Sequence, residues 1–327
     1  MEKAVASGHY LAGFLSYEAG YAFEQKLINK QNYDFPLIYF GVYKAPLTCP
    51  PAKSNNKPLF SAEGMNRSKE SYFADIEAIR SYIAEGDVYQ ITYCVKFSVE
   101  NKGDEYALYD KLKRVQRVPY PAFIKSKDFN ILSLSPELFL KKNGTKITTK
   151  PMKGTWPRDK DFFSNLIAGL RLKYDSKNRA ENIMICDLLR NDLGRIGKNV
   201  RAPKLFEVAK YKTLFQMTST VTADIDKDVD IYKLFKALFP SGSVTGAPKI
   251  RSMEIIRELE KEDRRIYTGA IGYITPQKDM MFNVPIRTML FRDNKGEMGV
   301  GGGITWYSTP QGEYDECLWK SKFITKL

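Results

Sequence analysis

The stretch VYQITYCVKFSV, residues 88–99, decides the fold class. Its apolar and polar side chains alternate, which places Tyr89, Ile91, Tyr93, Val95, Phe97 and Val99 on one face and Gln90, Thr92, Cys94, Lys96 and Ser98 on the other. A period of two residues is the pattern of a β-strand whose apolar face packs on a core. The opposite face of this strand is free to line a polar cavity.

Helices and strands follow one another on both sides of this stretch without a regular order. Apolar residues at helical spacing predict helices over 68–86, 175–193, 230–239, 248–262 and 312–326. Strands are predicted within 129–141, 211–222 and 266–307, with a hairpin at Asn143-Gly144. Because there is no βαβ repeat, P-loop or G-x-G-x-x-G motif, the sequence predicts an α+β fold with large, mostly antiparallel sheets.

Composition and charge exclude several classes of protein. The chain has 327 residues, and its apolar runs are too short to span a bilayer. The first residues, MEKAVASGHY, lack the hydrophobic core of a signal peptide, so we expect a cytoplasmic protein with no membrane partner. The net charge of +13 is dispersed among acidic residues, which favours a solvated basic face or an anionic small-molecule substrate. A nucleic-acid-binding protein is the alternative of a different class, and its binding would weaken steeply with salt.

The single histidine limits the possible chemistry. His9 lies near the N-terminus, so the body of the chain has no Ser-His-Asp or Cys-His arrangement. Acid–base catalysis must therefore come from Glu, Asp, Lys or Tyr side chains.

Three places carry residues that suit binding or catalysis, and each has a plain structural alternative. Glu181 lies beside an apolar stripe and is either a metal ligand or base, or a boundary residue in an ion pair. Glu313 and Glu316 are spaced i, i+3 at a predicted helix start, where acidic residues also suit the helix dipole. The glycine run 299–305 offers backbone N–H groups to a carboxylate, or forms a bulge. Carboxylates from the two acidic places would suit Mg²⁺, which takes one or two protein carboxylates together with waters.

Two further motifs stay open on the residues alone. The loop PSGSVTGAPK ends at a predicted helix N-terminus, which suits an anion but lacks the spacing of a nucleotide-binding loop. Lys153, in the run TKPMKGTWPR, is either a surface lysine or an amine whose backbone is fixed by the neighbouring prolines and glycine.

Taken together, these segments resemble the chorismate-utilising enzymes. Nine runs occur in family order across residues 68–327: GDVYQI, SPELFL, KPMKGTWPR, RAENIMICDLLRNDLGR, FPSGSVTGAPKIRSMEII, YTGAIGY, IRTM, GGGI and EYDECLWK. The family includes component I of aminodeoxychorismate synthase and of anthranilate synthase, and the isochorismate and salicylate synthases. The resemblance implies large antiparallel sheets forming a sandwich covered by helices. It also implies a chorismate-binding catalytic domain at 68–327, with 1–67 as a shortened N-terminal segment packing on it.

The resemblance assigns roles to residues at matching positions. Glu181 and Glu316 correspond to the Mg²⁺ ligands, with Glu313 acting beside them or through a water. Glu137 in SPELFL corresponds to the general acid that protonates the departing C4 hydroxyl of chorismate. The positions that bind the two carboxylates of chorismate correspond to Gly154, Thr155, Tyr267, Arg287, Gly301, Gly302, Gly303 and Lys320.

Two positions divide the family by its nucleophile and product. Members that use water carry a lysine as base where this chain has Gln90, so the resemblance implies ammonia as the nucleophile. Lys153 matches the P-x-K-G-T run of aminodeoxychorismate synthases, in which the lysine is thought to add at C2.

The implied function is that of component I of an aminodeoxychorismate synthase, making 4-amino-4-deoxychorismate for 4-aminobenzoate and folate synthesis. Its ammonia would come from a glutamine amidotransferase subunit. Component I of anthranilate synthase is the alternative within the family.

The chain also departs from the family pattern. Gln216 stands where many members carry a histidine, and Asn178 stands where many carry an acid three residues before Glu181. The N-terminal part is short compared with anthranilate synthase large subunits, so we expect no feedback by tryptophan. No lyase domain follows Leu327, so we expect another protein to release pyruvate.

Overall fold

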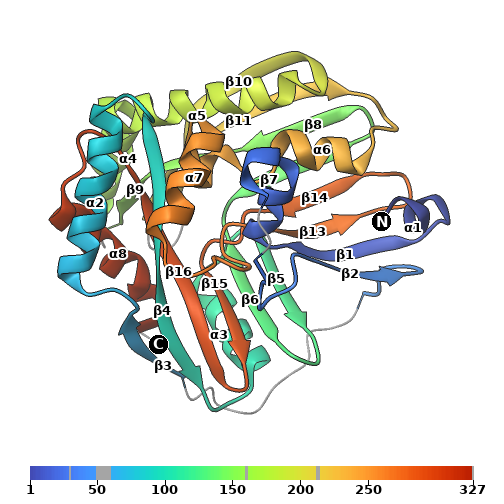
Figure 1. Cartoon of the computed structure of the whole chain (residues 1–327), viewed down its shortest axis with the longest axis horizontal. Helices are drawn as coiled ribbons and strands as arrows, with labels where there is room; N and C mark the ends of the chain where they lie inside the picture. Colours follow the sequence, from blue (N-terminus) through green and yellow to red (C-terminus); the bar gives the residue numbers. More distant parts are fainter. Residues whose placement is uncertain (29–30, 49–59, 159–160, 211–213, 326–327) are drawn as a thin grey trace.

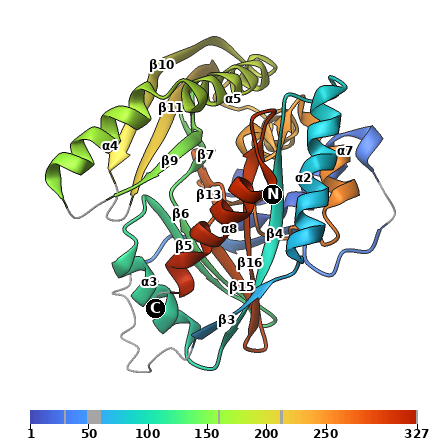
Figure 2. The same ribbon diagram turned by 90° about the vertical axis from the view of Figure 1, so that its left-hand side faces the viewer.

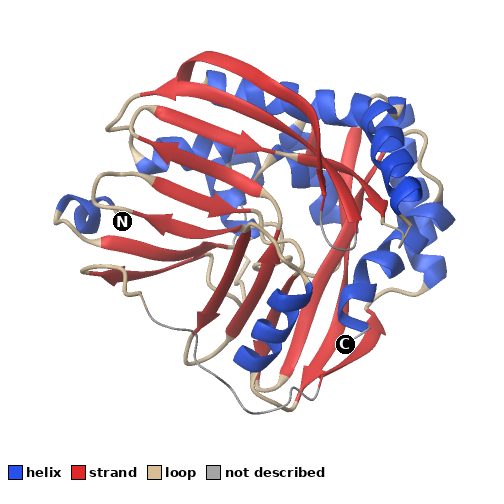
Figure 3. Cartoon of the chain, turned by 180° about the vertical axis from the view of Figure 1, so that it is seen from behind, coloured by secondary structure: helices blue, strands red, loops and turns tan. Residues whose placement is uncertain are grey.

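The fold consists of two large antiparallel sheets with helices on their outer sides (Figures 1 and 3). The computed structural model describes residues 1–28, 31–48, 60–158, 161–210 and 214–325. In spatial order, the larger sheet contains β10 (Gly197–Lys210), β11 (Leu214–Ile225), β8 (Lys146–Lys150), β7 (Leu138–Asn143), β14 (Met280–Asn283), β13 (Ala270–Ile274), β1 (Tyr10–Leu15) and β2 (Ile38–Tyr43), and β9 (Met152–Pro157) pairs with β11. The smaller sheet contains β12 (Gly246–Ala247), β4 (Gln90–Asn101), β16 (Lys295–Ile304), β15 (Thr288–Arg292), β6 (Asn130–Ser135) and β5 (Tyr120–Lys125), and β3 (Phe60–Met65) pairs with β4.

The helices cover these sheets. Described α-helices are α1 (Glu2–Ala6), α2 (Lys69–Ala84), α3 (Glu105–Val115), α4 (Phe162–Tyr174), α5 (Ser176–Gly194), α6 (Ile231–Leu238), α7 (Lys249–Leu259) and α8 (Pro310–Thr325). Short 3-10 helices are η1 (Tyr17–Phe23), η2 (Gln25–Leu27) and η3 (Gly242–Val244). Figure 2 shows α8 lying across β16, while α4 and α5 lie against β9, β10 and β11. The predicted α+β class with large antiparallel sheets is therefore confirmed.

Strand β4 supports the interpretation of its alternating pattern. Ile91, Tyr93 and Val95 are buried in the core that α2 and α8 cover, as the period of two predicts. The opposite face is also buried as far as Lys96, although Ser98 is exposed, and it includes Gln90 with no exposed surface. Tyr89 departs from the prediction, because it precedes the strand and is 68% exposed. Polar groups on a face that is withdrawn from water need partners, so this face is the place to look for a site.

The stretch 129–141, where the sequence predicts strands, crosses between the two sheets. Its two strands do not pair with each other, because β6 belongs to the smaller sheet and β7 to the larger one. Glu137 lies at this crossing, where its backbone O accepts from the N–H of Val284 at 3.1 Å. Val284 lies on a second crossing, from β14 to β15. The two crossings join the sheets at the place where Glu137 is held.

The N-terminal segment contributes to both sheets. Strands β1 and β2 extend the larger sheet beyond β13, and β3 pairs with β4 in the smaller sheet. Residues 1–67, which the resemblance describes as packing on the catalytic domain, therefore share its hydrogen-bonded sheets. The proposed division at residue 67 stays a prediction.

A buried arginine ties this segment to the smaller sheet. Arg264 is paired with Glu260 at 2.6 Å, and their side chains are 2% and 6% exposed. The guanidinium also donates to the backbone O of Thr92 at 2.7 Å and lies 4.4 Å from the ring centre of Tyr17. Thr92 belongs to β4 and Tyr17 to η1, so a single cation joins three parts of the chain.

We expect Arg264→Ala to lower the free energy of unfolding by about 3–5 kcal/mol, because it leaves Glu260 buried without its partner. Urea unfolding followed by circular dichroism measures this loss. Lys204→Ala is the matched control, because it removes an exposed pair with Glu207 and should cost about 0–1 kcal/mol. Equal losses in the two variants would show that Arg264 does not hold the N-terminal segment.

Candidate active site

The site is built around a glycine on β16. Gly303 lies opposite Thr92 in the pairing of β16 with β4. A methyl group on Gly303 would lie 2.3 Å from Gln90 Nε2 and 3.0 Å from Lys153 Nζ. The absence of a side chain at Gly303 therefore allows the Gln90 amide from the smaller sheet and the Lys153 amine from the larger sheet to approach the same point.

Gln90 has the features of a side chain that awaits a ligand. It is fully buried at the start of β4. Its Oε1 and Nε2 atoms have no hydrogen-bond partner within the described part of the chain. A buried amide with both atoms unsatisfied is costly, and such groups in proteins are normally paired with protein, water or ligand.

Lys153 faces the inside of the site and is not a surface lysine. Burial lowers the pKa of its amine, and the nearby carboxylates of Glu181 and Glu137 act in the opposite direction. Lys320 lowers this pKa further because two like charges repel. The next residue, Gly154, has a φ of +88°, and a methyl group there would lie 2.9 Å from Asn178 Oδ1. Glycine at this position therefore permits the turn of β9 that directs Lys153 toward Gly303.

Glu137 is a buried carboxyl group with a raised pKa. Burial raises the pKa of Glu137 to about 7, while a hydrogen bond from Ser243 and the charge of Lys153 both act to lower it. The Ser243 hydroxyl donates to Glu137 Oε1 at 2.6 Å. A carboxyl with a pKa near neutrality can exist as the acid in a site that also holds an amine.

Two acidic residues and a lysine from α8 lie beside Gly302, the neighbour of Gly303 on β16. A methyl group on Gly302 would lie 2.9 Å from Glu313 Oε2 and 3.8 Å from both Glu316 Oε1 and Lys320 Nζ. Lys320 pairs with Glu316 at 2.6 Å and donates to the backbone O of Gly301 at 2.6 Å. The charge of Lys320 lowers the pKa of Glu316, whereas burial raises the pKa of Glu313.

The donor chemistry of these carboxylates suits Mg²⁺. Burial raises the pKa of Glu181, and the negative charge of Glu316 raises it further, so the two carboxylates act on each other. A divalent cation would relieve that repulsion. Among residues 1–28, 31–48, 60–158, 161–210 and 214–325, no three His, Cys, Asp or Glu side chains form a complete metal site. This donor set fits an ion that keeps several ligands from water and substrate.

The glycine run has an open edge. Strand β15 pairs with β16 only from Lys295 to Met298, whereas β4 pairs with it as far as Ile304. Backbone groups of Gly301–Gly303 on the β15 side therefore have no strand partner in the described sheet. Backbone N–H groups of this kind can hold a carboxylate.

The remaining predicted binding residues lie on β9, before β13 and before β15. The ring of Tyr267 covers Gly299, where a methyl group would lie 2.2 Å from it. Arg287 lies at the crossing into β15 with a φ of +52°, and its guanidinium donates to Gln116 Oε1 at 3.4 Å. The backbone of Thr155 lies opposite Gln216 in β11, and the Thr155 side chain falls outside the described residues.

Sequence reasoning missed two residues of this site. Ser243 bonds Glu137 directly, although the PSGSVTGAPK loop was considered only as an anion site. The positive charge of Lys177 on α5 partly offsets the rise that burial causes in the pKa of Glu181. The same charge contributes to the lowered pKa of Glu316. No pattern marked Lys177, because only the fold brings the start of α5 close to α8.

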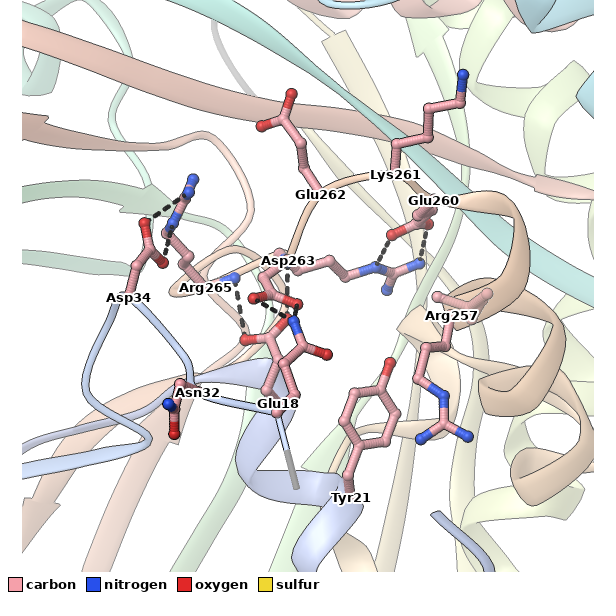
Figure 4. Close-up of a pocket in the computed structure, with 13 residues that line it drawn as sticks. Glu18, Tyr21, Asn32, Asp34, Arg257, Glu260, Lys261, Glu262, Asp263 and Arg265 are labelled. Carbon is pink, nitrogen blue, oxygen red and sulfur yellow. Dashed lines mark hydrogen bonds and ion pairs between the residues drawn. The ribbon is translucent and has the colours of Figure 1, made fainter. Parts of the chain in front are cut away.

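A separate cavity lies away from these residues. It has a volume of about 350 Å³ and lies between η1, residues 31–34 and the loop after α7 (Figure 4). Its lining includes two ion pairs, Glu260 with Arg264 and Asp34 with Arg265, and Figure 4 shows the second of them. None of the predicted site residues lines it.

Comparisons with known proteins identify the family of the chain. The sequence pattern of the family described as chorismate binding enzyme matches residues 2–326. The chain belongs to the chorismate binding enzyme family. None of the helices in the described ranges is long and apolar enough to cross a membrane.

Individual members of the family show the extent of the similarity. Aminodeoxychorismate synthase component 1 of Klebsiella aerogenes is 39% identical over 262 residues, which are 80% of this chain and 58% of that protein. Anthranilate synthase component 1 of Methanothermobacter thermautotrophicus is 33% identical over 340 residues, covering 97% of this chain and 73% of that protein. The crystal structure of anthranilate synthase component I from Streptococcus pneumoniae superposes with a TM-score of 0.82 at 26% identity, over 97% of this chain and 80% of that chain. The chain thus spans little more than half the length of the Klebsiella relative, and its fold is that of anthranilate synthase component I.

We expect Gly303→Ala to weaken chorismate binding about tenfold or more, because the added methyl group overlaps Gln90 and overpacking costs about 1–3 kcal/mol. Isothermal titration calorimetry with chorismate and Mg²⁺ measures the affinity. The control is Gly194→Ala at the end of α5, where an added methyl group has no neighbour within 4 Å. Unchanged binding by Gly303→Ala would place the ligand elsewhere.

Proposed function

We propose that this chain aminates chorismate at C4 with ammonia, as component I of an aminodeoxychorismate synthase. The observation that carries the proposal is the meeting of Lys153 and Gln90 at Gly303, with the buried acid Glu137 close to Lys153. An amine, an amide that cannot act as a base, and a proton donor are the groups that this reaction requires.

The proposed reaction has two bond exchanges. Lys153 Nζ forms a bond to C2 of the ring while both ring double bonds shift and the bond from C4 to its hydroxyl breaks. Glu137 gives its proton to that hydroxyl, which leaves as water. Ammonia then forms a bond to C4, both double bonds shift back, and the bond between Lys153 and C2 breaks. The proton lost by the new amine restores the acid, so the sum is chorismate plus ammonia giving 4-amino-4-deoxychorismate plus water.

The charges around the site support these roles. A lysine is nucleophilic only when neutral, and burial together with Lys320 lowers the pKa of Lys153. Gln90 has no proton-accepting nitrogen, so it can orient ammonia through its amide but cannot activate water. Lys320 and the open edge of Gly301–Gly303 provide a cation and backbone N–H groups for the carboxylates of chorismate. When bound by Glu181 and Glu316, Mg²⁺ would neutralise the ring carboxylate.

Ammonia is proposed to come from a glutamine amidotransferase partner. This part of the proposal rests on the chain having no Cys-His pair in its body and on relatives that are named component 1. With ammonium salts the chain alone should turn over, whereas turnover with glutamine should require the partner.

The product distinguishes this function from that of the anthranilate synthase relative. We expect 4-amino-4-deoxychorismate from chorismate, Mg²⁺ and ammonium, and a loss of about 10²-fold or more in kcat for Lys153→Ala, because its covalent route is closed. Liquid chromatography with mass spectrometry identifies the product. Lys177→Ala removes a nearby cation without removing the nucleophile, and should retain the same product. Fluorescent anthranilate, or an unchanged rate in Lys153→Ala, would overturn the proposal.

The rate should depend on pH through Glu137. The general acid must be protonated, and its pKa is about 7, so kcat should fall as pH rises through about 7. Glu137→Gln should lower kcat about 10²–10⁴-fold and remove this alkaline limb. Initial rates from pH 5 to 9 with saturating ammonium test both expectations. An alkaline limb that survives in Glu137→Gln would assign it to another group.

A further inference from the structure

The loop that carries Ser241 and Ser243 holds the buried acid through a chain of hydroxyl groups. Ser243 Oγ donates to Glu137 Oε1 at 2.6 Å, and Ser241 Oγ lies 2.9 Å from Ser243 Oγ. The three side chains are buried, with exposures of 3–4%. Such buried contacts are stable only when each hydroxyl proton has a definite acceptor.

The backbone around these serines is itself fixed. Thr245 Oγ1 donates to the backbone O of Ser241 at 3.2 Å, and the N–H of Thr92 donates to the backbone O of Thr245 at 2.7 Å. Gly242 between the serines packs under Leu188, which a methyl group would approach to 2.5 Å. The loop is therefore held on β4 and α5, and the direction of the Ser243 hydroxyl is set by its surroundings.

The hydroxyl chain has a consequence for the proton of Glu137. A hydroxyl carries one proton, so when Ser243 donates to Glu137, Ser241 is the donor in the contact between the two serines. When Ser243 donates to Oε1, the proton of the neutral carboxyl must reside on Oε2. The other groups acting on Glu137 are the backbone N–H of Met152 and the charge of Lys153, both from β9.

We propose that Ser243, oriented by Ser241, is a positioning residue that occupies Oε1 of Glu137 and so makes Oε2 the oxygen that delivers the proton. This role rests on the proposed function, in which Glu137 protonates the leaving hydroxyl. It adds a residue from the PSGSVTGAPK loop to the machinery of the reaction. Ser243 acts through Glu137 and forms no bond to the reacting atoms.

The variant Ser243→Ala tests the proposal. We expect kcat to fall about 10-fold or more, a part of the 10²–10⁴-fold that a general acid contributes, while KM for chorismate changes less than about threefold. A hydrogen bond to the ionised carboxylate favours that form, so its loss should move the alkaline limb of the pH profile to higher pH. Ser243→Thr retains the hydroxyl and should restore both the rate and the limb.

Two further variants separate this role from damage to the loop. Thr245→Val removes a hydroxyl that bonds only to the loop backbone, so its pH profile should match that of the wild type. Ser241→Ala acts one step away and should shift the alkaline limb in the same direction as Ser243→Ala, but less. It also provides the test if Ser243→Ala does not fold.

A readout without turnover separates this inference from the proposed function. Infrared titration of the carboxyl band, assigned by subtracting the spectrum of Glu137→Gln, follows the protonation of Glu137 with no substrate present. An upward shift in Ser243→Ala with reversal in Ser243→Thr supports the inference even if the product is not 4-amino-4-deoxychorismate. Identical titration in Ser243→Ala and wild type, or equal rate loss in Ser243→Thr and Ser243→Ala, would overturn it.

Discussion

The site depends on the missing side chain of Gly303. Any larger residue would occupy the position that Gln90 and Lys153 approach, because a methyl group there would meet both nitrogens. Gly302 has the same function toward α8, where it leaves room for Glu313. Strand β16 thus leaves room for two polar clusters at adjacent glycines. The open edge of this strand adds N–H groups between them, so one strand serves both the reacting end and the carboxylate-binding end of the proposed substrate.

The chemistry follows from burying groups of opposite charge at the junction of the two sheets. Burial raises the pKa of Glu137 and lowers the pKa of Lys153, which moves both toward neutral forms. A neutral acid and a neutral amine are the forms that protonate a leaving group and attack a ring carbon. The same low-polarity setting leaves Gln90 unsatisfied within the described chain, which is tolerable at a place that receives a ligand.

Much of the fold could be predicted from the sequence because its periodic patterns are local. The alternation in 88–99, the helix over 175–193 and the hairpin at Asn143-Gly144 all reflect neighbours within a few residues, and the structure has β4, α5 and the turn from β7 to β8 there. The crossing at 136–137 could not be predicted, since a pair of apolar runs looks the same whether the strands pair or separate into two sheets. For the same reason, sequence gave no sign that 1–67 supplies strands to both sheets.

The candidate site divides in the same way. Lys153, Glu137 and Gln90 were identified by resemblance, and the fold places them near one another. Ser243 and Lys177 were missed, because the roles of a hydroxyl and of a lysine at a helix end depend on the carboxylates that the fold brings close to them. The central claim is that Lys153 is the nucleophile. Mass spectrometry of the intact protein and of its proteolytic peptides after acid quench, with chorismate and Mg²⁺ but no ammonia, tests it most directly. The account predicts an adduct with the mass of chorismate less one water on the peptide that contains Lys153. Ammonia-dependent turnover with no such adduct would contradict it.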